Sequence, residues 1–196
     1  MKVIFLDHDG VICLATEWGG RHKKQQKVGR KLSQSVMSLP TDARFDNFNK
    51  KAIAVLNEIL EETGAEIVVS SDWKRWASVE EMGEYYESQG IIKKPIAFTK
   101  KIGDCTNYNP QTFQWSPKWE LEQERSLEIN QYLLDNPSIT HWVAVDDLNM
   151  GIPQTHDTWG EMVMDWGLTN FVLTPKSKEG IKQSGIKEKI IEYLTK

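Results

Sequence analysis

Five short apolar runs recur along the chain, and each is bounded by polar or turn-forming residues. They span residues 3–6, 67–69, 95–98, 141–145 and 171–173. Apolar runs of this length with such flanks are typical of strands that are covered on both faces. The pattern therefore predicts five buried strands.

Four segments between or after these runs carry apolar residues at helical spacing, over residues 47–63, 78–90, 120–134 and 185–195. Ser78 and Glu81 form a capping-box pattern at the start of the second segment. Asp46 can cap the first segment, and Gly64 suits its end. Strands that alternate with helices favour a mainly parallel sheet covered on both faces, which is a three-layer, Rossmann-like α/β fold.

Two stretches lack sustained periodicity. Residues 15–45 are polar, and Gly19-Gly20 within them predicts a tight hairpin tip, so we expect a flap or small cap there. Residues 99–119 are rich in Asn, Pro, Gly, Thr and aromatic residues, which predicts an insertion. Because 196 residues are enough for one well-buried core, we expect a single domain over residues 1–196.

Composition and charge narrow the class of protein. The formal net charge of −4 argues against a general nucleic-acid coat or a membrane-surface protein, since those are usually basic. Two cysteines, Cys13 and Cys105, form no CxxC pair, which favours a reducing compartment. The first apolar run is too short for a signal peptide, and no stretch approaches the length of a membrane span. We therefore expect a cytoplasmic protein.

Acidic and hydroxyl side chains follow three of the predicted strands, as Asp7-x-Asp9, Ser70-Ser71 and Asp146-Asp147. Taken singly, each cluster also has a structural interpretation, as a turn or a helix cap. The carboxyl ends of parallel strands meet at one edge of the sheet, however, so the three clusters should share one crevice. Carboxylates gathered there would repel one another without a cation, and Mg²⁺ prefers oxygen ligands.

These motifs resemble those of the haloacid dehalogenase superfamily. FLDHDGV is similar to its nucleophile motif, IVVSSDWK to its second motif and WVAVDD to its fourth. Within the superfamily, the chain most resembles the small phosphatase-like domains of Swiss-army-knife RNA repair proteins. The stretches Ser70-Ser71-Asp72-Trp73-Lys74 and Arg125 to Leu133 carry that closer likeness.

The resemblance implies a role for each acidic residue. Asp7 would attack phosphorus and become an aspartyl phosphate. Asp9 would protonate the leaving oxygen and later deprotonate the hydrolytic water. Ser70 would donate a hydrogen bond to the phosphoryl oxygens, whereas Asp146 and Asp147, with Asp7 and the backbone carbonyl of Asp9, would hold Mg²⁺.

The third motif, a basic residue that neutralises the phosphoryl group, is the weakest match. Arg125 stands where the helix before the last acidic strand should begin, and Lys118 is a rival seven residues earlier. Ser71, Lys74 and Gly10 complete the predicted substrate-binding set. A catalytic role for Arg125 competes with a simple position on the helix surface.

A basic run over residues 21–31 holds six Lys or Arg residues within an acidic protein. It predicts either a solvated loop or a flap that attracts a polyanionic substrate. Trp18, Trp73 and Trp76 follow strand ends and are candidates for stacking on a base. His8 alternates away from its two Asp neighbours, so we expect it to pack rather than to catalyse.

The resulting hypothesis is a Mg²⁺-dependent phosphomonoester hydrolase acting on nucleotides or nucleic-acid ends. Two alternatives remain open at this point: a sugar-phosphate phosphatase or mutase, and a catalytically silent module that binds phosphate or a nucleic-acid end. The Asp7/Asp9 pair counts against the silent module, because a binder needs no acid/base group two residues from a nucleophile.

Overall fold

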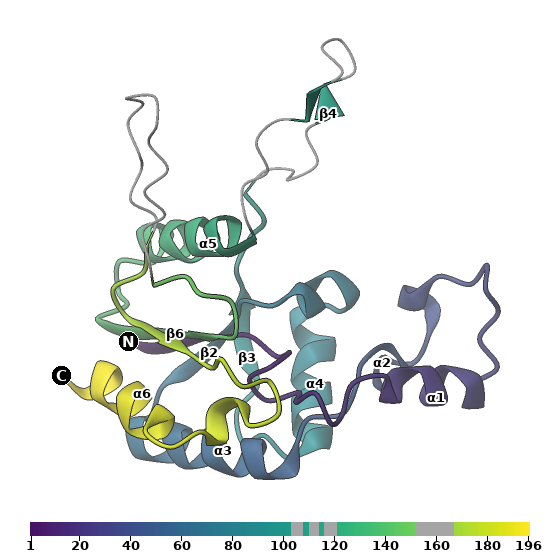
Figure 1. Ribbon diagram of the computed structural model, residues 1–196, viewed down its shortest axis with the longest axis horizontal. Helices are drawn as coiled ribbons and strands as arrows, with labels where there is room; N and C mark the ends of the chain where they lie inside the picture. The colour runs from purple at the N-terminus through teal and green to yellow at the C-terminus, as the bar shows by residue number, and fades with distance from the viewer. Residues whose placement is uncertain (103–107, 110–113, 116–120, 152–166) are drawn as a thin grey trace.

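The sheet at the centre of the molecule has five strands, all parallel (Figure 1). Their order is β3-β2-β1-β6-β7, and their bounds are Lys2–Leu6 for β1, Glu66–Val69 for β2, Pro95–Phe98 for β3, His141–Asp146 for β6 and Phe171–Leu173 for β7. The computed structural model describes residues 1–102, 108–109, 114–115, 121–151 and 167–196. The five predicted strands and the α/β fold class are confirmed.

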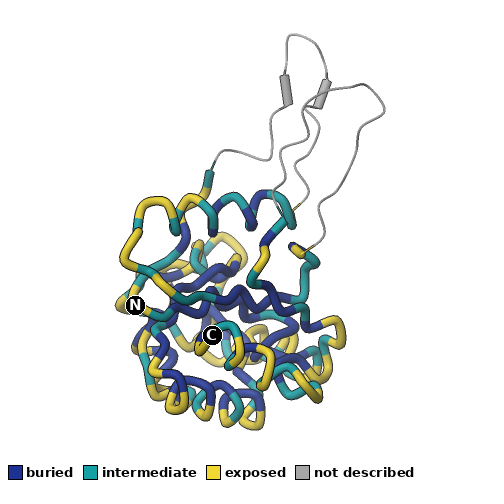
Figure 2. Tube along the Cα trace, turned by 90° about the vertical axis from the view of Figure 1, so that its left-hand side faces the viewer, coloured by how far each residue is buried: buried dark blue, intermediate teal, exposed yellow. Residues whose placement is uncertain are grey.

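Helices cover both faces of this sheet, and they bury alternate residues of its strands. On one face, Ile4 and Leu6 pack in a core with side chains of α3 (Lys50–Thr63), α4 (Val79–Gln89) and α6 (Ile186–Thr195). On the other face, Val3 and Phe5 pack with Ile129 of α5 (Leu121–Asp135). Figure 2 shows the dark, buried strands between the two helical layers. The three-layer prediction is confirmed.

The helix ends follow local sequence signals, with one exception. Ser78 and Glu81 form the predicted capping box of α4. Gly64 ends α3 in the left-handed conformation, with φ of 69°. The prediction that Asp46 caps α3 is wrong: Asn49 accepts from two backbone amides there. Asp46 instead accepts from the amides of Gly19 and Arg21, at distances of 3.2 and 2.5 Å.

Residues 15–45 contain helices where the sequence lacks an apolar period. They form α1 (Gly20–Lys27), the 3-10 turn η1 (Val36–Ser38) and α2 (Thr41–Arg44). Gly19 has φ of 84° and precedes α1, so the predicted hairpin tip at Gly19-Gly20 is wrong. The buried guanidinium of Arg44 fastens this region to α4 through two hydrogen bonds to Glu81, at 2.8 and 2.9 Å.

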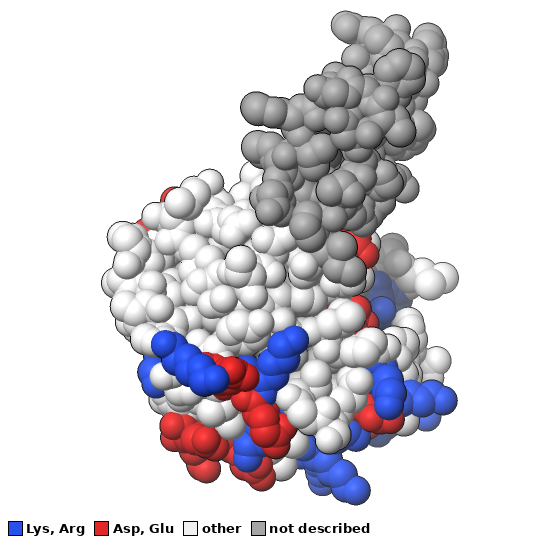
Figure 3. Space-filling model, turned by 60° about the vertical axis from the view of Figure 1, so that its left-hand side comes forward, with Lys and Arg blue, Asp and Glu red and all other residues white. Residues whose placement is uncertain are grey.

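Little of the predicted insertion at residues 99–119 lies within the described residues. Tyr108–Asn109 (β4) pairs antiparallel with Gln114–Trp115 (β5), and Lys118 and Cys105 lie outside the described residues. Among the described helices, none is both long and apolar enough to cross a lipid bilayer. On the face drawn in Figure 3, basic and acidic side chains lie close together over the lower part.

Candidate active site

Polar residues replace the apolar ones where the central strands reach their carboxyl ends. The backbone ladder continues one step past the strands: Ser70 N–H donates to Leu6 O at 3.0 Å, and Thr99 N–H to Val69 O at 3.0 Å. Asp7 N–H donates to Val145 O at 3.1 Å, which sets Asp7 beside Asp146. Asp7, Ser70, Thr99 and Asp146 are all buried. The sheet therefore brings four segments distant in sequence to its carboxyl end, the three that were predicted and the segment of Thr99.

Three carboxylates of this edge form a compact group. Asp7, Asp146 and Asp147 each offer an oxygen, and these oxygens lie within 4.8 Å of one another. Burial is the main cause that raises the pKa of Asp7 and of Asp146, and burial and Asp146 raise the pKa of Asp147 to about 6. A hard divalent cation bound among crowded carboxylate oxygens would reduce the repulsion between them.

Arg125 is the cation that the described residues place among these acids. Its Nη1 donates to Asp146 Oδ2 at 2.7 Å and lies 3.2 Å from Asp7 Oδ1. The Arg125 side chain is 13% exposed, and α5 holds it over the strand ends. Counted over the described residues, one guanidinium balances one of three carboxylates, which leaves an excess of negative charge that suits a divalent cation.

Gly10 gives the chain the room it needs next to Asp147. Its φ is +70°, and a Cβ at this position would lie 2.3 Å from Asp147 Oδ2. Its amide donates to Cys13 O at 2.9 Å, and its carbonyl accepts from Thr174 Oγ1 at 3.2 Å. Both backbone groups of Gly10 thus hold the loop after β1.

Ser70 and Ser71 lie at the same end of the sheet as Asp7, but their hydroxyl groups differ in their hydrogen bonds. The Ser71 hydroxyl hydrogen-bonds the Asp7 carboxylate and accepts from Trp73 N–H at 3.4 Å. The buried Ser70 Oγ has no hydrogen-bond partner among the described residues. A buried hydroxyl without a partner is costly unless a ligand completes it.

Asp9 is held by a side chain whose role the sequence did not reveal. Trp73 Nε1 donates to Asp9 Oδ2 at 2.8 Å. The indole is only 4% exposed and stacks with Phe45 and with Phe48, at centroid distances of 4.8 and 5.3 Å. The suggestion that Trp73 stacks on a base is therefore wrong. Trp18 and Trp76, which are 48% and 40% exposed, stay candidates for stacking.

His8 packs inside the fold, as predicted. Its Nε2 lies 2.6 Å from the Tyr86 hydroxyl, and its ring contacts Phe48 and Trp73. Burial, and secondarily Arg125, lowers the pKa of His8 to about 3, so the ring is neutral at ordinary pH.

Lys74 belongs to a second buried ionic group beside the first. Its ammonium pairs with the carboxylate of Glu128 on α5 and donates to Thr99 Oγ1 at 3.0 Å. Thr99 Oγ1 in turn donates to Glu128 Oε2 at 2.9 Å. A cleft of about 270 Å³ borders this second group, and its walls include Ser71, Lys74, Lys101, Leu121, Glu124 and Arg125. Sequence reasoning missed Thr99 and Glu128.

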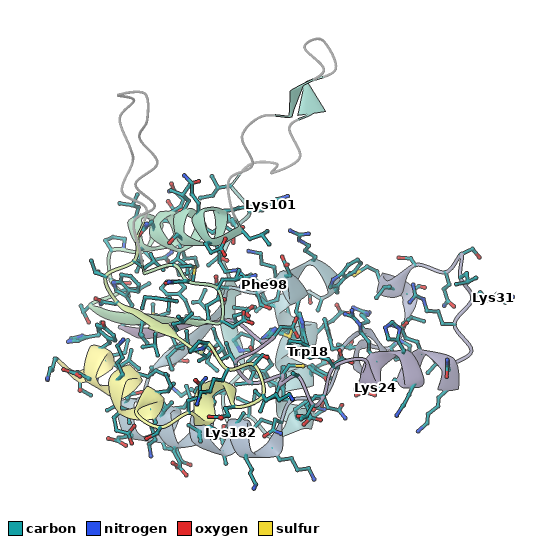
Figure 4. All side chains as sticks on the ribbon, viewed as in Figure 1. Trp18, Lys24, Lys31, Phe98, Lys101 and Lys182 are labelled. Atoms are coloured by element: carbon teal, nitrogen blue, oxygen red, sulfur yellow. The ribbon has the colours of Figure 1, made fainter. Side chains whose placement is uncertain are left out.

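The basic run of residues 21–31 lies largely on α1 and just after it, on the part of the molecule that projects from the sheet (Figure 4). Lys24 is tied inward, with hydrogen bonds to Asp42 Oδ1 and Phe45 O at 3.0 and 3.2 Å. Lys23 and Lys27 are exposed and, with Lys24, line a shallow groove. Arg21 is close enough to Asp9 to lower the pKa of that carboxyl against the dominant effect of burial, which raises it.

Comparison with known proteins identifies a family. The profile of the family described as "HAD domain in Swiss Army Knife RNA repair proteins" matches residues 3–183, which include every residue discussed in this section. No curated protein and no solved structure matches the chain.

Proposed function

Because the chain belongs to the HAD domain family of Swiss Army Knife RNA repair proteins, we propose that it is a Mg²⁺-dependent phosphomonoester hydrolase. The reaction would run through an aspartyl phosphate on Asp7. The observation that carries the proposal is the triad Asp7, Asp146 and Asp147, with oxygens within 4.8 Å of one another and Arg125 beside two of them.

The donor set fits a hard divalent cation. Asp7, Asp146 and Asp147 would hold Mg²⁺ together with the backbone carbonyl of Asp9, and the ion would offset the charge of the carboxylates and the phosphoryl group. Arg125 would neutralise a phosphoryl oxygen from the α5 side. The unpartnered Ser70 hydroxyl would donate to a second phosphoryl oxygen, and the Ser71 hydroxyl would orient Asp7.

In the first step, a carboxylate oxygen of Asp7 forms a bond to phosphorus while the bond from phosphorus to the leaving oxygen breaks. The Asp9 carboxyl gives its proton to that leaving oxygen. In the second step, Asp9 takes a proton from water as the water oxygen bonds to phosphorus. The Asp7–phosphorus bond breaks, which releases inorganic phosphate and restores both carboxyl groups.

Lys74 and Gly10, which the sequence predicts to bind substrate, stay predictions with a modified rationale. Lys74 lines the cleft next to Arg125. Because its ammonium is paired with Glu128, we expect Lys74 to act on a substrate indirectly, through the hydrogen bonds that it shares with Thr99. Gly10 contributes by the space that it leaves for Asp147. Neither role depends on direct contact with phosphate.

Trapping the intermediate tests this proposal. Protein mixed with a phosphorylated substrate and Mg²⁺, quenched in acid and reduced with borohydride, should carry homoserine at position 7 in peptide mass spectra. EDTA should abolish turnover of 4-nitrophenyl phosphate, and Asp7→Asn should abolish both turnover and trapping. Turnover in EDTA at the rate seen with Mg²⁺, or trapping at another residue, would contradict the mechanism.

For the substrate, we propose nucleotides or phosphorylated nucleic-acid ends. The family's association with RNA repair supports this class, and so do the exposed cations of α1, whose first turn is near Asp9. A panel of 3′- and 5′-phosphorylated oligonucleotides, nucleotides and sugar phosphates separates the alternatives. A tenfold advantage of sugar phosphates in kcat/KM would favour the sugar-phosphate phosphatase instead.

A further inference from the structure

We infer that Trp73 is the positioning residue of the acid/base carboxyl, and that its indole N–H fixes Asp9 for proton transfer to the leaving group. This inference rests on the proposed function, since it assigns a task to a residue that contacts Asp9 rather than substrate. It replaces the interpretation of Trp73 as a surface for stacking bases, which its burial excludes.

The contact is directional and short. Trp73 Nε1 donates to Asp9 Oδ2 at 2.8 Å, over a sequence separation of 64 residues. An indole N–H is a donor only, so this hydrogen bond cannot reverse its sense when the carboxyl gains or loses a proton. One oxygen of Asp9 thus keeps the same partner in both steps of the reaction.

The indole is itself held so that it cannot turn. Its ring is nearly parallel to the rings of both Phe45 and Phe48, with interplanar angles of 10° and 14°. His8 contacts it at a centroid distance of 4.7 Å, and the His8–Tyr86 hydrogen bond anchors that neighbour. Aromatic packing of this kind leaves the N–H one direction, toward Asp9.

The backbone carries the indole to this place. Trp73 lies in the 3-10 turn η2 (Asp72–Trp76), directly after Ser70 and Ser71. The Ser71 side chain accepts from the Trp73 amide at 3.4 Å and also hydrogen-bonds Asp7. The segment after β2 therefore contacts both reacting carboxyl groups, Asp7 through a serine and Asp9 through the indole.

A second donor reaches Asp9 from its own loop. The Cys13 thiol hydrogen-bonds the Asp9 carboxylate, and burial followed by the charge of Asp9 raises the pKa of Cys13 well above its usual range. The thiol therefore stays protonated and remains a donor. A thiol is a weak donor, so the indole N–H should dominate the orientation of Asp9.

Trp73→Phe removes the N–H while leaving an aromatic ring in the stack. Protonation by Asp9 matters most for a poor, alkyl leaving group, and little for 4-nitrophenolate. We expect kcat/KM for an alkyl phosphate to fall about 10- to 100-fold, by analogy with the usual worth of a positioned acid. For 4-nitrophenyl phosphate, kcat/KM should change less than threefold, because this ratio reports only the formation of the aspartyl phosphate.

The second step gives an independent readout. Asp9 would also serve as the base that activates water, so Trp73→Phe should slow loss of the aspartyl phosphate and lower kcat for both substrates. Rapid mixing with 4-nitrophenyl phosphate should then show a burst of nitrophenolate about equal to the enzyme concentration. A merely structural defect would lower the active fraction and shrink the burst.

Trp142→Phe is the matched control. Trp142 also packs in the core, edge to face on Phe5, but it lies at the start of β6, at the opposite end of the strand from Asp146. Its variant should leave the ratio of the two kcat/KM values unchanged. If Trp73→Phe lowers kcat/KM equally for both leaving groups, or leaves both unchanged, the positioning role is wrong while the proposed function stands.

If Trp73→Phe does not fold, the contact can be tested in protein that keeps Trp73. In ¹⁵N-labelled protein, the Trp73 indole N–H resonance should shift upfield by at least 0.5 ppm in ¹H on Asp9→Ala, with the Trp142 resonance unmoved. An unchanged Trp73 resonance would overturn the inference. Turnover by Asp7→Asn, in contrast, would overturn the proposed function itself.

Discussion

Two buried ionic groups lie side by side beneath α5, and they differ in how their charges balance. In the group of Lys74, Glu128 and Thr99, one ammonium meets one carboxylate and the hydroxyl completes the hydrogen bonds. In the acidic triad, Arg125 is the one basic residue that the described part of the chain places against Asp7 and Asp146, with Asp147 beside them. Burial makes an unbalanced charge costly. The triad carries this cost, whereas the neighbouring group, whose charges balance, does not.

We interpret the balanced group as a part that stabilises the fold and the triad as a part that binds ligands. A balanced pair gains nothing from a further ion, whereas the excess negative charge of the triad is relieved by an added cation or, at lower pH, by protonation. Substitutions in the two groups should therefore have opposite consequences: loss of stability in the balanced group, and loss of activity with unchanged or increased stability in the triad.

Removal of the proposed nucleophile, Asp7, should have the largest effect. We expect Asp7→Asn to lower kcat for 4-nitrophenyl phosphate by roughly 10⁵-fold, or about 7 kcal/mol, because an amide cannot form the aspartyl phosphate. Steady-state kinetics in saturating Mg²⁺ measures this, and thermal unfolding should show an intact fold. A loss smaller than tenfold would show that another group is the nucleophile.

Breaking the balanced pair should act on stability instead. Glu128→Leu leaves the Lys74 ammonium buried without its carboxylate, which should lower the free energy of unfolding by about 3–5 kcal/mol. Urea unfolding measures the change. The double variant Lys74→Met/Glu128→Leu should regain most of the loss, because no unpaired charge remains. If the single and double variants are equally destabilised, packing rather than charge balance explains the effect.

Gly10→Ala should damage the triad through its backbone. The new Cβ meets Asp147 Oδ2 at 2.3 Å, and φ of +70° is strained for alanine, so we expect destabilisation by about 2–3 kcal/mol. The displaced Asp147 should also weaken Mg²⁺ binding, measured by titration calorimetry. Gly29→Ala is the control, since its φ is +68° but no atom lies within 4 Å of the added carbon. Equal effects in both variants would assign the cost to φ alone.

Within the triad, removal of a charge should stabilise the metal-free protein. Asp147→Asn is expected to raise the free energy of unfolding in EDTA at pH 7 by about 1–2 kcal/mol, discounted because Asp147 is partly exposed. The folded carboxyl keeps its proton to about pH 6, whereas the unfolded one loses it near 3.8, so wild-type stability falls as pH rises between these values. Urea unfolding against pH should show a flatter profile for the variant.

Saturating Mg²⁺ should reverse that ranking, because the wild type retains a ligand that the variant lacks. The stability gained on adding Mg²⁺ should therefore be larger for wild type than for Asp147→Asn. An equal gain in both proteins would remove Asp147 from the cation site.

The smallest effect concerns the basic run. Lys24 is tied to Asp42, so the pair Lys23→Gln/Lys27→Gln tests the exposed charges alone. We expect KM for a phosphorylated oligonucleotide to rise about tenfold at low salt, with a shallower salt dependence and unchanged kinetics on 4-nitrophenyl phosphate. Lys182→Gln/Lys189→Gln, which changes the same charge on η3 (Gly180–Lys182) and α6, is the control. Equal effects of the two pairs would make the run a solvated surface.

The framework of the site could be predicted because it depends on local signals. Apolar runs that end in Asp7, Ser70 and Asp146 locate the strand ends, and parallel pairing then brings them together. Helix α1 was not predicted, because it carries almost no apolar face. Asp46, which is distant in sequence, accepts hydrogen bonds from the backbone amides at the start of this helix. No local pattern could encode that contact.

The partners of the reacting groups were also beyond local reasoning. In the sequence, Trp73 follows shortly after a strand end, where an aromatic side chain can lie either on the surface or in the core. Its burial depends on Phe45 and Phe48, which reach it from a separate segment. Glu128 and Thr99 were missed for a similar reason, since each appears ordinary until α5 lies against the end of β3.

The loop after β1 is closed by a residue from the far end of the chain. Thr174, directly after β7, donates to the Gly10 carbonyl across 164 positions, and the same carbonyl belongs to the glycine that makes room for Asp147. Formation of the proposed cation site therefore needs contacts of very high sequence separation, which are slow to form. During refolding, the recovery of Mg²⁺ affinity should lag behind the recovery of helical circular dichroism. A nascent chain on the ribosome that does not yet include β7 should therefore contain Asp7 but lack a formed cation site.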